Sequence, residues 1–206
     1  MKCPICQTRN PRRQCPGVQA DICSVCCGSE REVSIDCPLD CSYLREARAH
    51  QKLAVWDPAT MPNADIDITE RFIQEHRDVA LYIGLSLHLA VAETAGAVVD
   101  RDVREALHSL TSSYRSLVSG ILFESPLVNP FAHGIYKAVR AFIAETRVKM
   151  RDSEILGALV LYQRMALSYD NGRPKGRAFI YFLGTDFKAM AGHHAAEREA
   201  PRLIEL

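Results

Sequence analysis

The chain has 206 residues, of which 48% are hydrophobic, and its formal net charge at pH 7 is zero. This length and composition predict one medium-sized domain with a hydrophobic core and one small appended domain. The zero net charge excludes a global field that would draw the protein to nucleic acid or to acidic membranes. Residues 1–6 are polar and contain two cysteines, whereas a signal peptide needs an apolar stretch, so we expect a cytoplasmic protein.

All eight cysteines lie in the first 41 residues of the chain. Their order is Cys3-x2-Cys6, Cys15, Cys23-x2-Cys26-Cys27 and Cys37-x3-Cys41. The two Cys-x-x-Cys pairs are separated by 16 residues, a spacing typical of a four-thiolate zinc site. The short loop inside each pair brings both sulfurs onto one ion. The pattern therefore predicts a zinc-binding module.

Three alternatives to zinc use the same residues. A small disulfide scaffold is usually secreted, and here the cysteines are joined to a long cysteine-free segment with no export signal. Thiol redox chemistry of the thioredoxin type needs a βαβ pattern near the Cys-x-x-Cys pair, and no such pattern follows. An iron–sulfur site is the third alternative. Spacing and compartment together favour zinc over all three.

The adjacent residues Cys26 and Cys27 indicate two zinc sites, because neighbouring cysteines cannot easily chelate one tetrahedral ion. We assign Cys3, Cys6, Cys23 and Cys26 to the first zinc, and Cys15, Cys27, Cys37 and Cys41 to the second. The ligands of the two sites then alternate along the chain, as in cross-brace modules. Gly28 is expected to adopt the positive φ that the corner after Cys27 requires.

The segment between the last cysteines has its own local signals. Residues 32–36 alternate polar and apolar side chains and predict a short strand that leads into Cys37. Pro38 suits the first position of a helix that would run to about Val55. Cys37 and Cys41 would then lie one turn apart at the start of this helix.

Several motifs of this chain carry a resemblance to one group of proteins. They are Cys3-Pro4-x-Cys6, Arg12-Arg13-x-Cys15-Pro16, Cys23-x-x-Cys26-Cys27-Gly28, Arg31-Glu32-Val33, Cys37-Pro38-x-Asp40-Cys41-x-Tyr43-Leu44, Asn171-Gly172-Arg173-Pro174 and Arg177-Ala178-Phe179. The chain resembles a group of uncharacterised bacterial proteins with such an N-terminal module and a helical C-terminal domain, for which no activity is implied. The interleaved cysteines are also similar to MYND and HIT fingers, which hold two zincs and bind partner proteins. Those fingers usually include a ligand histidine, and this segment has none before His50.

After the cysteine module, residues 1–56, we expect a proline-containing linker at 57–66, a helical bundle at 67–188 and a polar tail at 189–206. Five helices are predicted: Asp67 to about Thr94, Asp100 or Asp102 to about Phe123, Asn129-Pro130 to near Met150, Asp152 or Ser153 to Asn171-Gly172, and Arg177 to Phe187. The expected fold class is mainly α, with a strand-plus-helix zinc module before an all-α bundle. The apolar run at 79–92 is too short to span a bilayer.

No complete catalytic motif is present, so we predict that the protein is not an enzyme and identify no small-molecule substrate. Glu105-x-x-His108 has the spacing used in di-iron bundles, and Glu93 and Glu145 are predicted on neighbouring helices. The second Glu-x-x-His is missing, because Gly157 follows Glu154 at that spacing. We expect His193 and His194, in an alanine-rich tail, to be exposed rather than metal-bound.

Candidate polyanion-binding residues form two groups of cations, Arg9, Arg12 and Arg13, and Arg173, Lys175 and Arg177; a further cluster lies at 147–151. Two zincs, each held by four thiolates, would change the formal charge of residues 1–56 from +2 to about −2, which disfavours a spare polyanion patch. The favoured hypothesis is an intracellular protein–protein interaction or adaptor protein with structural zinc. The alternative is a zinc-finger regulator that binds nucleic acid, which steep salt dependence of binding would reveal.

Overall fold

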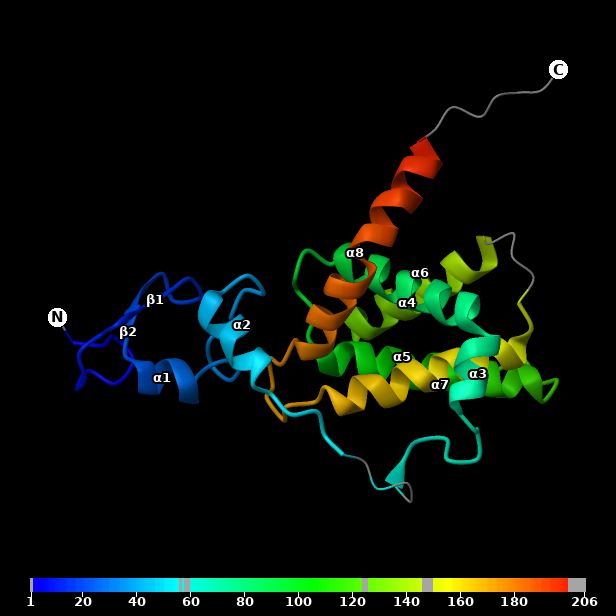
Figure 1. Ribbon diagram of the computed structural model, residues 1–206, viewed down its shortest axis with the longest axis horizontal. Coiled ribbons are helices and arrows are strands. Elements are labelled where there is room, and N and C mark those ends of the chain that lie inside the picture. The colour runs from blue at the N-terminus through cyan, green and yellow to red at the C-terminus, as the bar shows by residue number, and fades with distance from the viewer. Residues whose placement is uncertain (1, 56, 58–59, 124–125, 146–149, 200–206) are drawn as a thin grey trace.

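The computed structural model describes residues 2–55, 57, 60–123, 126–145 and 150–199. In this part of the chain there are eight helices and one two-stranded antiparallel sheet. The N-terminal cysteine module forms one end of the molecule and the helical body forms the other (Figure 1). The predicted fold class, a small strand-plus-helix module followed by a helical domain, is confirmed.

The cysteine module is built from four short elements. Strands β1 (Arg13–Cys15) and β2 (Ala20–Ile22) pair antiparallel, and helices α1 (Ser24–Ser29) and α2 (Ser42–Ala49) follow. Its small core contains Ile22 and Leu44, which are fully buried among the cysteines. Six of the nine buried residues of this core are cysteines, so few aliphatic side chains are available to stabilise the module.

The structure corrects three local predictions in the module. The strand predicted at 32–36 is absent: the described chain has only a bridge between Arg31 and Ile35, and Glu32 turns through φ 53°. Helix α2 begins after Cys41, because the amide of Cys41 donates to the carbonyl of Pro38 and closes a turn there. Gly28 lies inside α1, where helical geometry requires no positive φ.

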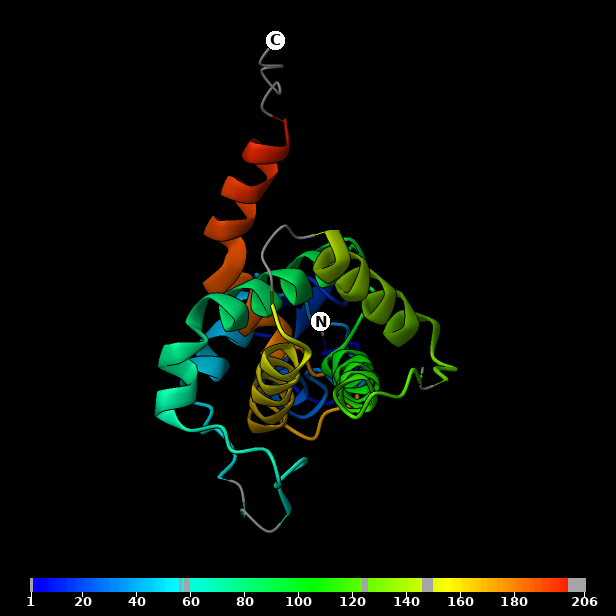
Figure 2. The ribbon, with the colours of Figure 1, turned by 90° about the vertical axis from the view of Figure 1, so that its right-hand side faces the viewer.

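The helical body consists of α3 (Glu70–Glu75), α4 (Arg77–Ala92), α5 (Asp100–Val118), α6 (Pro130–Glu145), α7 (Asp152–Ser168) and α8 (Ala178–Glu199). Helices α5 and α7 lie side by side, and α4 and α6 pack against them (Figure 2). Gly84 of α4 permits close packing, because a Cβ there would collide with Tyr162 of α7 and Phe187 of α8. The Tyr162 hydroxyl donates to the carbonyl of Ala80 at 2.9 Å.

The helix predicted from Asp67 to Thr94 is two helices, which meet at His76 (φ −116°, ψ 28°). Thr69 rather than Asp67 caps the first of them, accepting a hydrogen bond from the amide of Phe72 at 3.1 Å. The break places the Phe72 ring against Gly157 of α7, at the position a Cβ would occupy. A tertiary contact thus overrides the continuous helical pattern.

Other helix ends also differ from the sequence prediction. Helix α5 ends at Val118 rather than Phe123, because Gly120 turns the chain with φ 75°. Helix α6 is described as far as Glu145, and the rest of its predicted length at 146–149, with the basic residues there, lies outside the described part. Helix α8 continues past Phe187 to Glu199 and leads away from the body (Figure 1). None of the described helices has the length and apolarity that crossing a membrane would require.

Candidate metal centre

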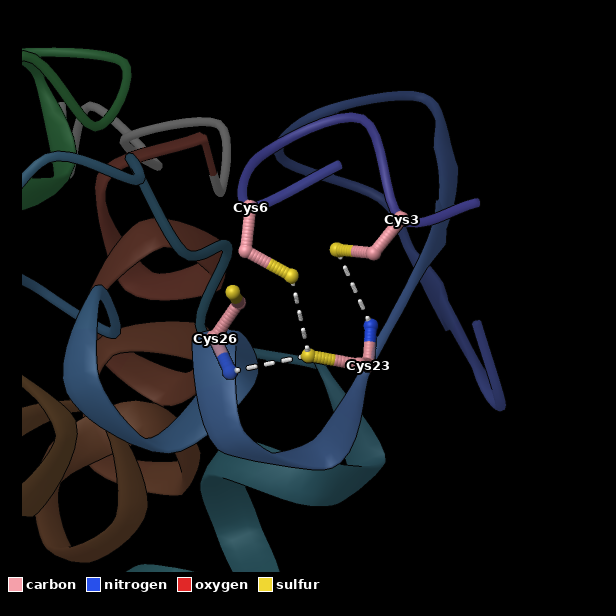
Figure 3. A group of neighbouring side chains, drawn as sticks. All are labelled: Cys3, Cys6, Cys23 and Cys26. Atoms are coloured by element: carbon pink, nitrogen blue, oxygen red, sulfur yellow. Dashed lines mark hydrogen bonds between the residues drawn. The ribbon is translucent and has the colours of Figure 1, made fainter. Parts of the chain in front are cut away.

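Cys3, Cys6, Cys23 and Cys26, called here the first cysteine group, converge at the end of the module (Figure 3). Their four sulfurs all lie within 4.8 Å of one another, and the Cys6 and Cys23 sulfurs are 3.9 Å apart. Tetrahedral zinc with bonds of about 2.3 Å would hold its sulfurs about 3.8 Å apart. The group therefore has the donor set and spacing to hold a metal ion.

Local backbone geometry produces this convergence. The amide of Cys3 donates to the carbonyl of Arg9 at 2.8 Å, and the amide of Gln7 donates to the carbonyl of Cys3 at 2.7 Å. Gln7 has a positive φ of 55°, which turns the chain just after Cys6. Further amides point at sulfur: Cys23 N–H donates to Cys3 Sγ at 3.3 Å, and Cys26 N–H donates to Cys23 Sγ at 3.4 Å. Such bonds stabilise thiolates.

The electrostatics of the first cysteine group favour a cation. Hydrogen bonds from the Thr8 hydroxyl and from the amides of Arg9 and Thr8 lower the pKa of Cys6 to about 5. Burial, followed by the neighbouring sulfurs of the group, raises the pKa of Cys26 to about 12. The Cys6 thiol thus ionises readily, while the Cys26 thiol resists ionisation, chiefly because it is buried and also because other sulfurs of the group lie beside it. A bound metal cation would remove that resistance.

Cys15, Cys27, Cys37 and Cys41, the second cysteine group, are arranged differently. All four line one small cavity, together with Arg13 and Arg31. In the described part of the chain, only the first group has its sulfurs within 4.8 Å of one another. The two guanidinium groups point at the same sulfur instead: Arg13 Nη1 and Arg31 Nη2 lie 3.4 and 3.9 Å from Cys27 Sγ.

All eight cysteines are free thiols. Burial raises the pKa of Cys37, which keeps its thiol protonated in the absence of a cation. The predicted second site is therefore gathered around one cavity, and the predicted first site has the compact geometry of a metal centre.

Glu32 joins the cysteine module to the helical body. Its side chain is buried, and its carboxylate accepts hydrogen bonds from Arg48 Nη2 at 2.7 Å, Asn171 Nδ2 at 3.0 Å and the amide of Arg177 at 3.1 Å. Its carbonyl also accepts from the amide of Lys175 at 2.8 Å. One residue of the module thus binds three residues of the loop at 171–177, called here the junction loop.

The cations of the junction loop, predicted as polyanion-binding candidates, contact the module. The Arg173 guanidinium donates to the carbonyls of Gly28 and Arg31. The other two cations also contact the module: Lys175 Nζ donates to the carbonyl of Ser34 at 3.1 Å, and Arg177 pairs with Asp36 at 2.8 Å. These three charges hold the two parts of the chain together.

The N-terminal candidates divide in two. Arg13 lies beside Cys27 and over the ring of Tyr43, and a hydrogen bond to the Cys23 sulfur raises the pKa of Arg9. Arg12, in contrast, is exposed. Sequence reasoning missed Glu32, and it interpreted the junction loop as a helix stop with candidate polyanion-binding cations rather than as a contact with the module. The one signal was that Arg31-Glu32-Val33 and Asn171-Gly172-Arg173-Pro174 are both among the motifs that carry the resemblance described above.

The structure does not gather the residues of the hypothetical di-iron site. Glu105 accepts from Asn129 Nδ2 at 3.0 Å, and His108 is exposed on the same helix. Glu93 and Glu145 are also exposed, and the Phe72 ring occupies the place beside Gly157. In the tail, His193 is exposed, whereas the His194 ring lies 5.2 Å from the ring of Phe142.

Comparison with known proteins assigns the chain to no family. No family model matches the chain, and neither the curated proteins nor the solved structures include a significant match. Function must therefore be argued from the geometry of the cysteine groups and of the surfaces around them.

Proposed function

We propose that this chain is a structural zinc-binding protein that serves as a protein–protein interaction or adaptor module. The observation that carries the proposal is the convergence of four sulfurs in the first cysteine group. Zinc suits four thiolates in a closed tetrahedral site, and a closed site has no open position for a substrate. Its role is to fold a segment whose hydrocarbon core is too small to fold alone.

A second zinc belongs to the second cysteine group. Its support is that Cys15, Cys27, Cys37 and Cys41 line the same cavity. The guanidinium groups of Arg13 and Arg31 already approach Cys27, where they would offset the negative charge of a four-thiolate zinc centre.

The adaptor role rests on the surface of the helical body. Large apolar side chains are exposed where α5 leads to α6: Val118, Ile121, Leu122, Phe123, Val128 and Phe131. Six large apolar side chains exposed within one short stretch of the chain favour a protein-binding surface there. Five of the six candidate polyanion-binding cations make contacts within the chain, which leaves Arg12 and favours the adaptor role over nucleic-acid binding.

Metal content with a free-thiol count tests the zinc assignment. Protein purified without added metal should contain two zincs per chain, and its thiols should become titratable only after chelation. Cys23→Ser and Cys15→Ser should each retain one zinc, from opposite groups. A single zinc in the wild type, lost only in Cys23→Ser, would remove the second site. Protein that takes up no zinc would contradict the proposal.

The adaptor role needs a separate test. Cross-linking in the source cells, followed by mass spectrometry, should join a partner protein to residues near 118–131, and Leu122→Asp should abolish the cross-link. Ala141→Asp, on an exposed part of α6, is the control. Salt-sensitive binding of a labelled RNA or DNA, without a protein cross-link, would instead support the nucleic-acid function.

A further inference from the structure

A cleft lies between α2 of the cysteine module and the first turns of α8, with a volume of about 360 Å³. Arg45, Arg48 and Ala49 line it from α2 at three- and four-residue spacing, and Tyr181 and Phe182 line it from α8. Tyr169, just after α7, contributes a third ring. This volume and this position between two parts of the chain are typical of small-ligand sites.

One wall of the cleft is aromatic. The rings of Tyr169 and Phe182 stack with their centroids 5.0 Å apart and their planes inclined by 26°. The guanidinium carbon of Arg48 lies 4.9 Å from the ring centroid of Tyr181. All three rings line the cleft and are only partly buried, so each leaves aromatic surface exposed for contact with a ligand.

Arg48 supplies a second, independent indication of a ligand. Its side chain is only 8% exposed, and its Nη2 pairs with Glu32 at 2.7 Å. Its Nε and Nη1 are buried and have no hydrogen-bond acceptor among the residues that the structure describes. Buried donors on a charged group rarely lack acceptors, because they have lost water without gaining a partner.

The charges around the cleft indicate the ligand's sign. Glu32 pairs with Arg48 through Nη2 alone, so the Nε and Nη1 donors of this guanidinium face no carboxylate among the described residues. Arg45 adds an exposed cation on the same side of the cleft. Asp186 lies on α8 and lines the opposite side of the cleft. An anionic ligand group is therefore favoured near the arginines of α2 and disfavoured beside Asp186.

We propose that this cleft binds a small planar aromatic carboxylate, with its ring on the aromatic wall and its carboxylate at Arg48 and Arg45. Guanidinium groups suit carboxylates, and a slight movement of the Arg48 side chain would present its unpartnered donors. This function is additional to zinc binding and to the adaptor role. Because the ligand touches both α2 and α8, it should also stabilise their junction.

Calorimetry of the full-length, zinc-loaded chain with 2-naphthoate tests the site, and 2-naphthamide is the matched uncharged probe. We expect one naphthoate per chain with a Kd below about 1 mM, and about tenfold weaker binding of the amide. Absence of naphthoate binding in this range would overturn the proposal. Equal binding of the amide would overturn the anionic ligand class.

Variants locate the bound probe. Ala49→Trp should fill the cleft and weaken naphthoate binding at least about tenfold, whereas Ala141→Trp, the same change on an exposed part of α6, should not alter it. Arg48→Lys keeps a cation for Glu32 and should weaken naphthoate binding by a similar factor. Unchanged binding in Ala49→Trp would overturn the assignment to this cleft. Zinc content, measured on each variant, separates failure at this site from failure of the metal centre.

Discussion

The two cysteine groups show how four thiols can be brought together in two ways. In the first group, tight turns and amide–sulfur hydrogen bonds within residues 3–26 hold the sulfurs within 4.8 Å of one another. In the second group, the sulfurs surround a cavity, and Cys27 and Cys37 flank the segment that carries Glu32. Glu32 binds the junction loop of the helical body. The bonds that shape the first group thus lie within residues 3–26, whereas the second group flanks a segment that contacts the bundle.

Replacing Glu32 should have the largest effect. Glu32→Ala would leave Arg48, Asn171 and the amide of Arg177 without their acceptor, and should lower the free energy of unfolding by about 3 to 5 kcal/mol. Chemical denaturation followed by far-UV circular dichroism measures this loss. Glu46→Ala, an exposed change on α2, is the control. A loss below about 1 kcal/mol would show that the junction does not depend on Glu32.

Burial raises the pKa of Asp100 to about 6, although the amides of Ile180 and Phe179 donate to its carboxylate and oppose the rise. Its ordinary value is 3.8, so its favourable contribution to folding is complete below about pH 4 and is lost as the pH rises through 6. This loss should reach about 3 kcal/mol.

Unfolding of wild-type protein and Asp100→Asn across this pH range measures the difference directly, and the subtraction cancels the pH effects that both proteins share, including acid release of any bound metal. The wild type should lose stability relative to the variant between pH 4 and 6. If the stability of the wild type instead rose relative to the variant over this range, the amide donors would outweigh burial. Ionisation of Asp100 would then strengthen its hydrogen bonds to α8.

Cys37→Ser and Cys3→Ser separate the two groups directly. Loss of the second group should loosen the Glu32 segment and lower the melting temperature of the helical body by at least about 4 °C. Loss of the first group should change that temperature by less than about 2 °C, since its contacts are local. Thermal melts at a helix-sensitive wavelength give both values. Equal changes in melting temperature would show that the two cysteine groups do not differ in their link to the helical body.

The smallest contrast concerns two neighbouring arginines. Arg13→Ala removes contacts with Cys27 at 3.4 Å and with the ring of Tyr43 at 4.7 Å, and should cost about 1 kcal/mol of stability. Arg12→Ala, at an exposed side chain, should stay within about 0.5 kcal/mol of wild type. A similar cost for both would mean that Arg13 does not stabilise the second group.

The sequence predicted features set by local spacing. The first cysteine group follows from two Cys-x-x-Cys pairs, and the helices of the body follow from apolar periodicity and from Gly172, which ends the turn after α7 with φ 68°. Local patterns failed where distant residues decide the conformation. The helix breaks after Phe72, whose ring fits against Gly157. Glu32 does not form the predicted strand, because its carboxylate accepts hydrogen bonds from donors about 140 residues away.

The cations of the junction loop show the same limit of prediction from local sequence. Arg173, Lys175 and Arg177 form a basic cluster that sequence alone cannot distinguish from a polyanion-binding patch. Only the fold reveals that their acceptors lie on the module, at Gly28, Ser34 and Asp36. Residues brought together by tertiary structure leave no spacing signal in one chain.

Zinc K-edge X-ray absorption on protein purified with its own metal tests most directly whether cysteines alone form the metal centre. The spectrum should fit four sulfur neighbours at about 2.3 Å, with no nitrogen or oxygen ligand. The Cys23→Ser variant should lose the four-sulfur coordination of one of its two zincs. Nitrogen or oxygen ligands in the wild type, or protein without zinc, would contradict the closed four-thiolate centre.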